Sequence, residues 1–153
     1  MCRHTRTWLC AIAASWVLLC PARAYCELGG DLRSVERDRA KMNATLTVTP
    51  MGRYTVHEMM SESGARVREF EAPGGRVFAV TWQGSFPPDF QQLLGPYFAD
   101  LQQAAGARRA RRAPVFIETP GFVFQTFGHF RDLGGRAYVP GLLPAGVSAE
   151  DLQ

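Results

Sequence analysis

The chain has 153 residues, of which 46% are hydrophobic and 20% are charged, the composition of a globular protein with room for one domain. Its net charge of +3 is due to Arg3, Arg6 and Arg23, because the residues after position 24 contain fourteen Lys and Arg and fourteen Asp and Glu. A balanced chain has no long-range attraction for nucleic acid or for an anionic membrane. We therefore expect no nucleic-acid partner.

The first 24 residues have the pattern of a secretory signal peptide. A short basic stretch (residues 2–6) precedes twelve mostly apolar residues (8–19), and Ala22-Arg23-Ala24 is an A-x-A cleavage site. Twelve residues are too few for a helix that spans a bilayer, which needs about 20. We predict that residues 1–24 are cleaved on export and that residues 25–153 form a single domain without a transmembrane segment, periplasmic or extracellular in a Gram-negative bacterium.

Cysteine usage agrees with this division. Three of the four cysteines lie within residues 1–24, so only Cys26 stays in the exported protein. No internal disulfide can form there. An intermolecular disulfide and a free thiol are both open for Cys26.

After the signal, the sequence predicts a short helix and then a run of strands. Residues 31–42 place Leu32, Val35 and Met42 near one helical face, with Asp31 as the N-cap. Four β-prone segments follow, separated by short Pro- and Gly-containing turns that join antiparallel neighbours: residues 45–49, 53–59, 65–71 and 76–82. The last has apolar side chains on both faces, with Phe78, Val80 and Trp82 on one of them, and so predicts a central, fully buried strand.

The second half repeats this order. Residues 89–105 have apolar side chains at helical spacing, and Gly95-Pro96 predicts a kink or two short helices that meet there. Strands follow at residues 115–118, 122–131 and 136–139, and an extended tail begins at about residue 140. We predict an α+β fold, an antiparallel meander with a short N-terminal helix and a kinked amphipathic helix packed on one face.

Two histidines are the imidazole bases of the exported chain. His57 lies within a predicted strand, and His129 is followed closely by Asp132. Either could be the acid/base of a small hydrolase or transferase, or a half-exposed strand residue. Neither lies beside a nucleophile motif, so we assign no catalytic residue. The histidines and carboxylates lack the spacing of a metal site, and we expect no metal or cofactor.

The densest positive charge follows the second helix. It consists of Arg108, Arg109, Arg111 and Arg112. This cluster could bind phosphate, an anionic glycan or lipid head groups. It could equally be a solvated loop or a site of proteolytic cleavage.

Strand aromatics indicate a binding surface. In residues 122–131, Phe122, Phe124 and Phe130 alternate with Val123, Phe127 and His129, so both faces carry apolar bulk. If helices cover only one face, the other is a binding surface or the interface of a homodimer; the alternative is a core on both sides. Aromatic and arginine side chains suit such a surface, for which we select Trp82, Phe86, His129, Arg131 and Arg136.

Seven motifs, taken together, resemble one family. They are residues 28–31 (LGGD), 54–58 (YTVHE), 67–70 (VREF), 75–82 (GRVFAVTW), 93–98 (LLGPYF), 135–140 (GRAYVP) and 143–147 (LPAGV). The chain resembles the short exported proteobacterial proteins grouped as domain of unknown function 2844. This resemblance implies a small bacterial envelope protein, and it implies no activity, ligand or catalytic residue.

We therefore interpret the chain as a non-catalytic periplasmic binding or interaction protein. Its expected partner is an envelope protein or another component of the cell envelope. The alternative is a small periplasmic hydrolase or transferase that uses His129 with Asp132, or His57, as its acid/base.

Overall fold

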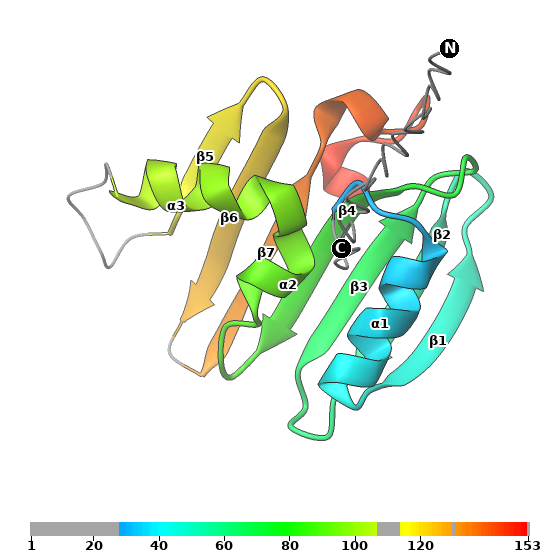
Figure 1. The fold of residues 1–153 in the computed structure, drawn as a ribbon, viewed down its shortest axis with the longest axis horizontal. Helices are drawn as coiled ribbons and strands as arrows, with labels where there is room; N and C mark the ends of the chain where they lie inside the picture. The colour runs from blue at the N-terminus through cyan, green and yellow to red at the C-terminus, as the bar shows by residue number, and fades with distance from the viewer. Residues whose placement is uncertain (1–27, 107–113, 130, 153) are drawn as a thin grey trace, which may run out of the picture.

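The computed structural model describes residues 28–106, 114–129 and 131–152. Their strands form one seven-stranded antiparallel sheet in the order β1-β2-β3-β4-β7-β6-β5 (Figure 1). The strands are β1 (Thr45–Pro50), β2 (Thr55–Met60), β3 (Arg66–Glu71), β4 (Val77–Gly84), β5 (Phe116–Thr119), β6 (Phe122–His129) and β7 (Asp132–Tyr138). The predicted α+β fold with an antiparallel sheet is confirmed.

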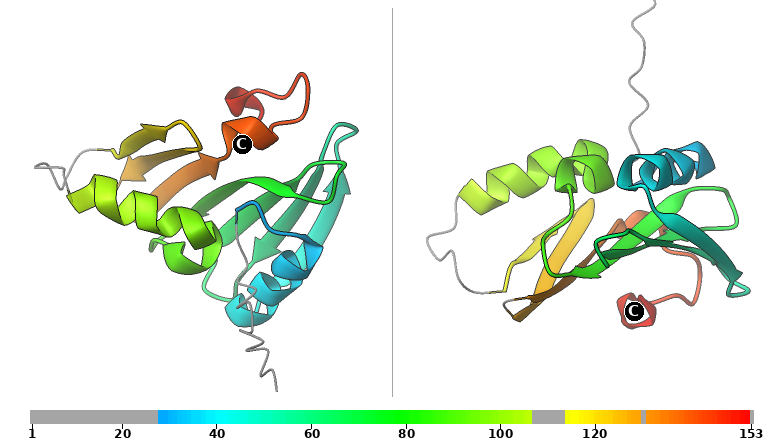
Figure 2. Two further views of the ribbon diagram at one scale, coloured as in Figure 1. Left: turned by 45° about the horizontal axis from the view of Figure 1, so that its top comes forward. Right: turned by 90° about the horizontal axis from the view of Figure 1, so that it is seen from below.

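The helices lie on one face of this sheet. They are α1 (Leu32–Met42), α2 (Phe90–Leu94) and α3 (Phe98–Gly106), the last two joined by a 3-10 turn, η1 (Gly95–Tyr97). The predicted break at Gly95-Pro96 is confirmed, because Pro96 has no N–H to continue the α-helical bonding. Seen from below, α1 and the α2–α3 pair lie side by side above the strands (Figure 2). None of the helices in the described ranges is long and apolar enough to cross a bilayer.

The helix-side core contains the larger of the two apolar clusters that the described residues form. Strand β4 lies at the centre of the sheet, and its first six residues are all buried, as predicted. Trp82 contacts Phe90 of α2 edge-on and stacks on Phe124 of β6, with ring centroids 5.1 and 5.3 Å apart. At the start of β6, Phe122 stacks on Tyr97 of η1, with ring centroids 5.2 Å apart. These ring contacts fix the α2–α3 pair on the sheet.

The expected alternation along β4 is wrong at Phe78. Phe70 pairs with Ala79 and Glu71 pairs with Val77, so the register passes over Phe78 and forms a β-bulge. Phe78 therefore packs with Phe70 and Ala79 on the face away from the helices, whereas Val80 and Trp82 pack against the helices.

The C-terminal segment covers part of the face away from the helices. It contains two 3-10 turns, η2 (Pro140–Leu142) and η3 (Ala149–Asp151), and Figure 2 shows it on the side of the sheet opposite the helices. Leu152 is buried against Phe70 and Phe78, and Arg53 Nη1 donates a 2.6 Å hydrogen bond to Gly146 O. This segment leaves the neighbouring part of the sheet uncovered. We call that uncovered part the open face.

Helix α1 is joined to α2 by a buried polar contact. The Asp38 carboxylate accepts a hydrogen bond from Gln92 Nε2, and both side chains are buried. The expected N-cap at Asp31 is confirmed by a 3.0 Å bond from Arg33 N. The expected apolar face is wrong at Leu32, which is 48% exposed, because α1 turns Ser34, Val35 and Asp38 inward instead.

Asp89 caps α2, and the lowered pKa of its carboxyl predicts that this cap weakens in acid. Partial burial raises the pKa of its carboxyl, but hydrogen bonds from Gln92 N and Lys41 outweigh this and hold the pKa below its usual value. A lowered pKa means that the carboxylate stabilises the fold at neutral pH and that this contribution is lost as the pH falls through the folded-state pKa. We predict that Asp89→Ala lowers the free energy of unfolding by about 1 kcal/mol at pH 7 and by less near pH 3.

Urea unfolding at the two pH values measures this difference. Asp89→Asn is the control, because it keeps the capping oxygen but cannot ionise, so we expect it to lose less stability than Asp89→Ala at pH 7 and almost none relative to the parent protein near pH 3. An equal loss for Asp89→Ala at both pH values would contradict the account.

Candidate functional site

Two rows of side chains cross the open face. One row runs from Arg66 on β3 through Gln83 on β4 and Gly134 on β7 to Phe127 on β6. The other runs in the same order through Arg68, Thr81, Arg136 and Gln125. Directly paired residues project from the same face of a sheet, so the members of each row share a face. On every strand the two rows are two positions apart, which places both rows on the same face.

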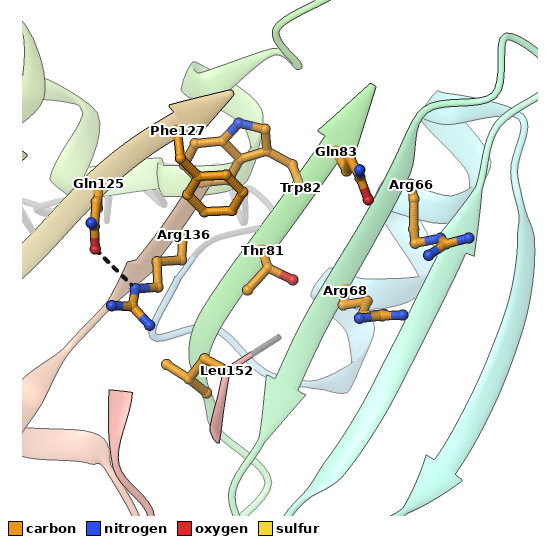
Figure 3. Close-up of a pocket in the computed structure, with 9 residues that line it drawn as sticks. All are labelled: Arg66, Arg68, Thr81, Trp82, Gln83, Gln125, Phe127, Arg136 and Leu152. Carbon is orange, nitrogen blue, oxygen red and sulfur yellow. Dashed lines mark hydrogen bonds between the residues drawn. The ribbon is translucent and has the colours of Figure 1, made fainter. Parts of the chain in front are cut away.

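These rows enclose a cavity of about 480 Å³, which we call the open-face pocket (Figure 3). The residues that line it are Arg66, Arg68, Thr81, Trp82, Gln83, Gln125, Phe127, Arg136 and Leu152. Leu152 closes one side, so the C-terminal segment forms a wall of the pocket. The volume is within the range of small-molecule sites, roughly 300–1,000 Å³.

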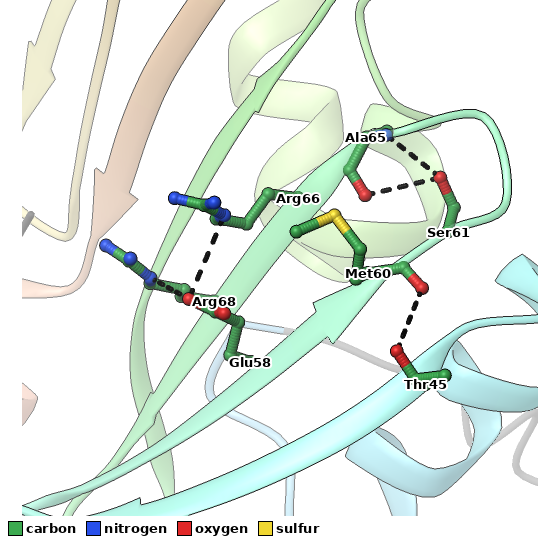
Figure 4. Close-up of polar contacts among 7 residues, drawn as sticks. All are labelled: Thr45, Glu58, Met60, Ser61, Ala65, Arg66 and Arg68. Atoms are coloured by element: carbon green, nitrogen blue, oxygen red, sulfur yellow. Dashed lines mark hydrogen bonds and ion pairs between the residues drawn. The ribbon is translucent and has the colours of Figure 1, made fainter.

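Two of the three arginines share one carboxylate. Glu58 Oε2 lies 2.5 Å from Arg68 Nε and 3.9 Å from Arg66 Nε (Figure 4). The Nε atom of Arg66 is buried and makes no hydrogen bond within the described residues. The Arg66 side chain is nevertheless 42% exposed, so the rest of its guanidinium is open to the pocket and can donate hydrogen bonds to a ligand.

The third arginine is held between the sheet and the C-terminal segment. Arg136 Nε donates to Gln125 Oε1 at 3.1 Å, and its Nη1 donates to Ala149 O. The pKa of the exposed Glu150 is lowered mainly by a backbone hydrogen bond and by Ser148, and to a smaller extent by the charge of Arg136. These contacts orient the guanidinium of Arg136 at the edge of the pocket.

Two glycines of β7 provide space for aromatic rings on the two faces of the sheet. A Cβ at Gly135 would lie 2.2 Å from Trp82 Cζ2, on the helix side. A Cβ at Gly134 would lie 2.5 Å from Phe127 Cε2, on the open face. Each ring therefore lies directly on the backbone of β7. Phe127 is 50% exposed and presents an apolar surface at one end of the pocket.

A family model described as "Protein of unknown function (DUF2844)" matches residues 24–152. The chain belongs to the DUF2844 family. The resemblance seen in its sequence motifs is thereby confirmed. Neither the curated proteins nor the solved structures contain a match to this chain.

Of the five surface residues selected from the sequence of this DUF2844 protein, two line the open-face pocket. These are Arg136 and Trp82, although Trp82 is only 4% exposed and belongs mainly to the helix-side core. Phe86 is 79% exposed in the loop between β4 and α2 and lines another hollow. His129 and Arg131 lie at the hairpin between β6 and β7, outside the residues that line the pocket.

The candidate acid/base residues of this DUF2844 protein are not among the residues that line the pocket, although Asp132 contacts one of them. His57 is buried, and its Nε2 lies 2.8 Å from Glu71 Oε2, an arrangement that ties β2 to β3. His129 pairs in register with Asp132, and Asp132 Oδ1 accepts a 3.1 Å bond from Gln83 Nε2. In the described ranges, no group of three or more His, Cys, Asp and Glu side chains is placed to hold a metal ion.

Some predictions for this DUF2844 protein concern residues outside the described ranges. The cluster of Arg108, Arg109, Arg111 and Arg112, the signal segment with Cys26, and Phe130 are among them. Conversely, sequence reasoning missed several pocket residues. Arg66 and Arg68 occupy alternate positions of β3, and this spacing was the signal that both face the same side of a strand.

Proposed function

We propose that this DUF2844 protein is an exported, non-catalytic binding protein that holds an anionic ligand in the open-face pocket. The observation that carries the proposal is the position of Arg66, Arg68 and Arg136 around one cavity. Of the nine described residues that line it, three are cationic and none is acidic. Guanidinium groups offer paired N–H donors that match carboxylate and phosphate oxygens.

The neutral side chains of the pocket also favour binding over catalysis. Gln83, Gln125 and Thr81 supply amide and hydroxyl groups, which orient a ligand by hydrogen bonds. The two histidines proposed as acid/base lie elsewhere, His57 beside Glu71 and His129 at the β6–β7 hairpin. We therefore propose the binding function and not the alternative hydrolase or transferase.

Export is part of the proposal because of the N-terminal pattern. Residues 1–24 combine a basic stretch, a short apolar stretch and an A-x-A site. The family match begins at residue 24, next to the predicted cleavage site. We propose that the ligand or partner is a component of the cell envelope.

The proposal predicts that Arg66→Gln weakens the binding of small anions about tenfold. Arg66 is the best position because its side chain is 42% exposed and its Nε lies 3.9 Å from Glu58, whereas Arg68 is hydrogen-bonded to Glu58 and Arg136 anchors the C-terminal segment. A tenfold change corresponds to about 1.4 kcal/mol, the lower end of what a charged hydrogen bond contributes. Calorimetric titration with inorganic phosphate and with acetate measures the effect.

Arg33→Gln is the matched control, because the side chain of Arg33 is 89% exposed on α1, on the other side of the sheet. We expect this variant to bind like the parent protein. Raised salt should weaken binding to the parent protein, since exposed charges are screened. Equal affinities of the Arg66→Gln variant and the parent protein would refute the proposed site.

A further inference from the structure

We infer that the ligand of the open-face pocket is an amphiphilic anion, with a carboxylate or phosphate at one end and a flat apolar group at the other. This inference rests on the proposed function and specifies its ligand class. It follows from the different chemistry of the two ends of the pocket.

The charged end lies on β3. Arg66 and Arg68 occupy alternate positions there, so both side chains leave the same face of the strand. The carboxylate of Glu58, on the neighbouring strand β2, contacts the Nε atoms of both arginines (Figure 4). Two guanidinium groups against one carboxylate leave an excess of positive charge at this end. A ligand carboxylate or phosphate would balance that charge and accept hydrogen bonds from the exposed parts of the two guanidinium groups.

The apolar end lies on β6. The ring of Phe127 covers Gly134, where the sheet has no side chain, and it stays half exposed toward the pocket. Figure 3 shows this ring at the opposite end of the pocket from Arg66 and Arg68. A half-exposed aromatic ring is a surface on which a planar apolar group can stack.

The distance between the two ends sets the length of the ligand. Strands β3 and β6 are separated by β4 and β7, so three strand spacings of about 4.8 Å give roughly 14 Å between the two ends. Thr81, Gln83 and Arg136 lie between them and offer polar groups along the way. A cavity of about 480 Å³ is much larger than a single small anion needs, so the ligand carries a larger uncharged group in addition to its anion.

Three probes separate the two contributions. Biphenyl-4-carboxylate has both the anion and the flat apolar part, acetate has only the anion, and biphenyl-4-carboxamide has only the apolar part. We expect biphenyl-4-carboxylate to bind at least tenfold more tightly than either of the others in NMR titrations of the whole protein. Phe127→Ala should reduce this advantage at least threefold and leave the affinity for acetate unchanged.

Two further variants keep the result interpretable. Phe127→Leu covers Gly134 but lacks the ring, so it should lose the advantage even if Phe127→Ala proves poorly folded by circular dichroism. Phe116→Ala removes another half-exposed aromatic ring, on β5, and should keep the full advantage. If the advantage survived in both Phe127 variants, the apolar end would be misplaced and the inference overturned.

The failures of the two proposals differ. If acetate and biphenyl-4-carboxylate bound equally and Arg66→Gln weakened both, the anion site would stand and the amphiphilic ligand would be refuted. If neither anion bound the parent protein, the proposed function itself would be overturned. If the carboxamide bound as tightly as the carboxylate, the arginines would play no part and both would fail.

Discussion

Trp82→Ala should lower the free energy of unfolding by about 3–5 kcal/mol, as is usual when a buried large aromatic is removed. Trp82 is 4% exposed on the central strand, and its ring contacts Phe90, Phe124 and the backbone of Gly135. The substitution therefore leaves a cavity beneath α2 and breaks the contacts that hold this helix on the sheet. Single domains are commonly stable by about 5–15 kcal/mol, so the loss is large.

Urea unfolding followed by far-UV circular dichroism measures this loss without depending on tryptophan fluorescence. The control is Phe86→Ala, which removes another aromatic ring two residues after the end of β4. Phe86 is exposed, and we expect a change of no more than about 0.5 kcal/mol. Similar losses in the two variants would show that Trp82 does not organise the core.

Gly135→Ala should cost about 3 kcal/mol although it adds a single methyl group. The new Cβ would lie 2.2 Å from Trp82 Cζ2 and 2.5 Å from the backbone oxygen of Gln125. The Trp82 ring is buried and the Gln125 oxygen belongs to the adjacent strand, so neither can move away without disturbing the sheet. Overpacking of this kind costs about 1–3 kcal/mol or more.

Two glycine variants test the reason for this cost by the same urea measurement. A Cβ at Gly74, in the β3–β4 turn, meets nothing within 4 Å, so Gly74→Ala should be close to neutral. Gly134→Ala should lie between the two, because the half-exposed ring of Phe127 can swing outward. If Gly135→Ala were as harmless as Gly74→Ala, Trp82 would not lie on β7 as described.

The elements of the fold were predictable because local signals agreed with one another. Asp31 and the Gly95-Pro96 pair mark helix boundaries by their own backbone chemistry. The uninterrupted apolar run of β4 requires burial on both faces. Such signals act within a few residues, and the structure confirms each of them.

Two details depend on contacts that are distant in sequence. Phe78 changes face because its strand bulges opposite Glu71, and no pattern within β4 reveals a bulge. Leu32 stays exposed because α1 turns Asp38 toward Gln92, a residue 54 positions away. Tertiary pairing decides both cases, so periodicity alone could not.

The pocket was only partly predictable for the same reason. The sequence indicated that Arg136 and Trp82 belong to a binding surface, and both line the pocket. It could not show that Arg66, Arg68 and Phe127 join them, because that requires the order of β3, β4, β7 and β6 in the sheet. The strand order also connects residues from the two halves of the chain, which no local motif encodes.

The most direct test of the anion-binding account is an NMR titration that follows the Nε–Hε signals of the arginines while inorganic phosphate is added. We predict that the signals of Arg66, Arg68 and Arg136 move together and saturate with one dissociation constant. Backbone signals of β3, β4 and β7 should follow them, while those of α1 stay unchanged. A response confined to Arg108, Arg109, Arg111 and Arg112, or no response at all, would contradict the account.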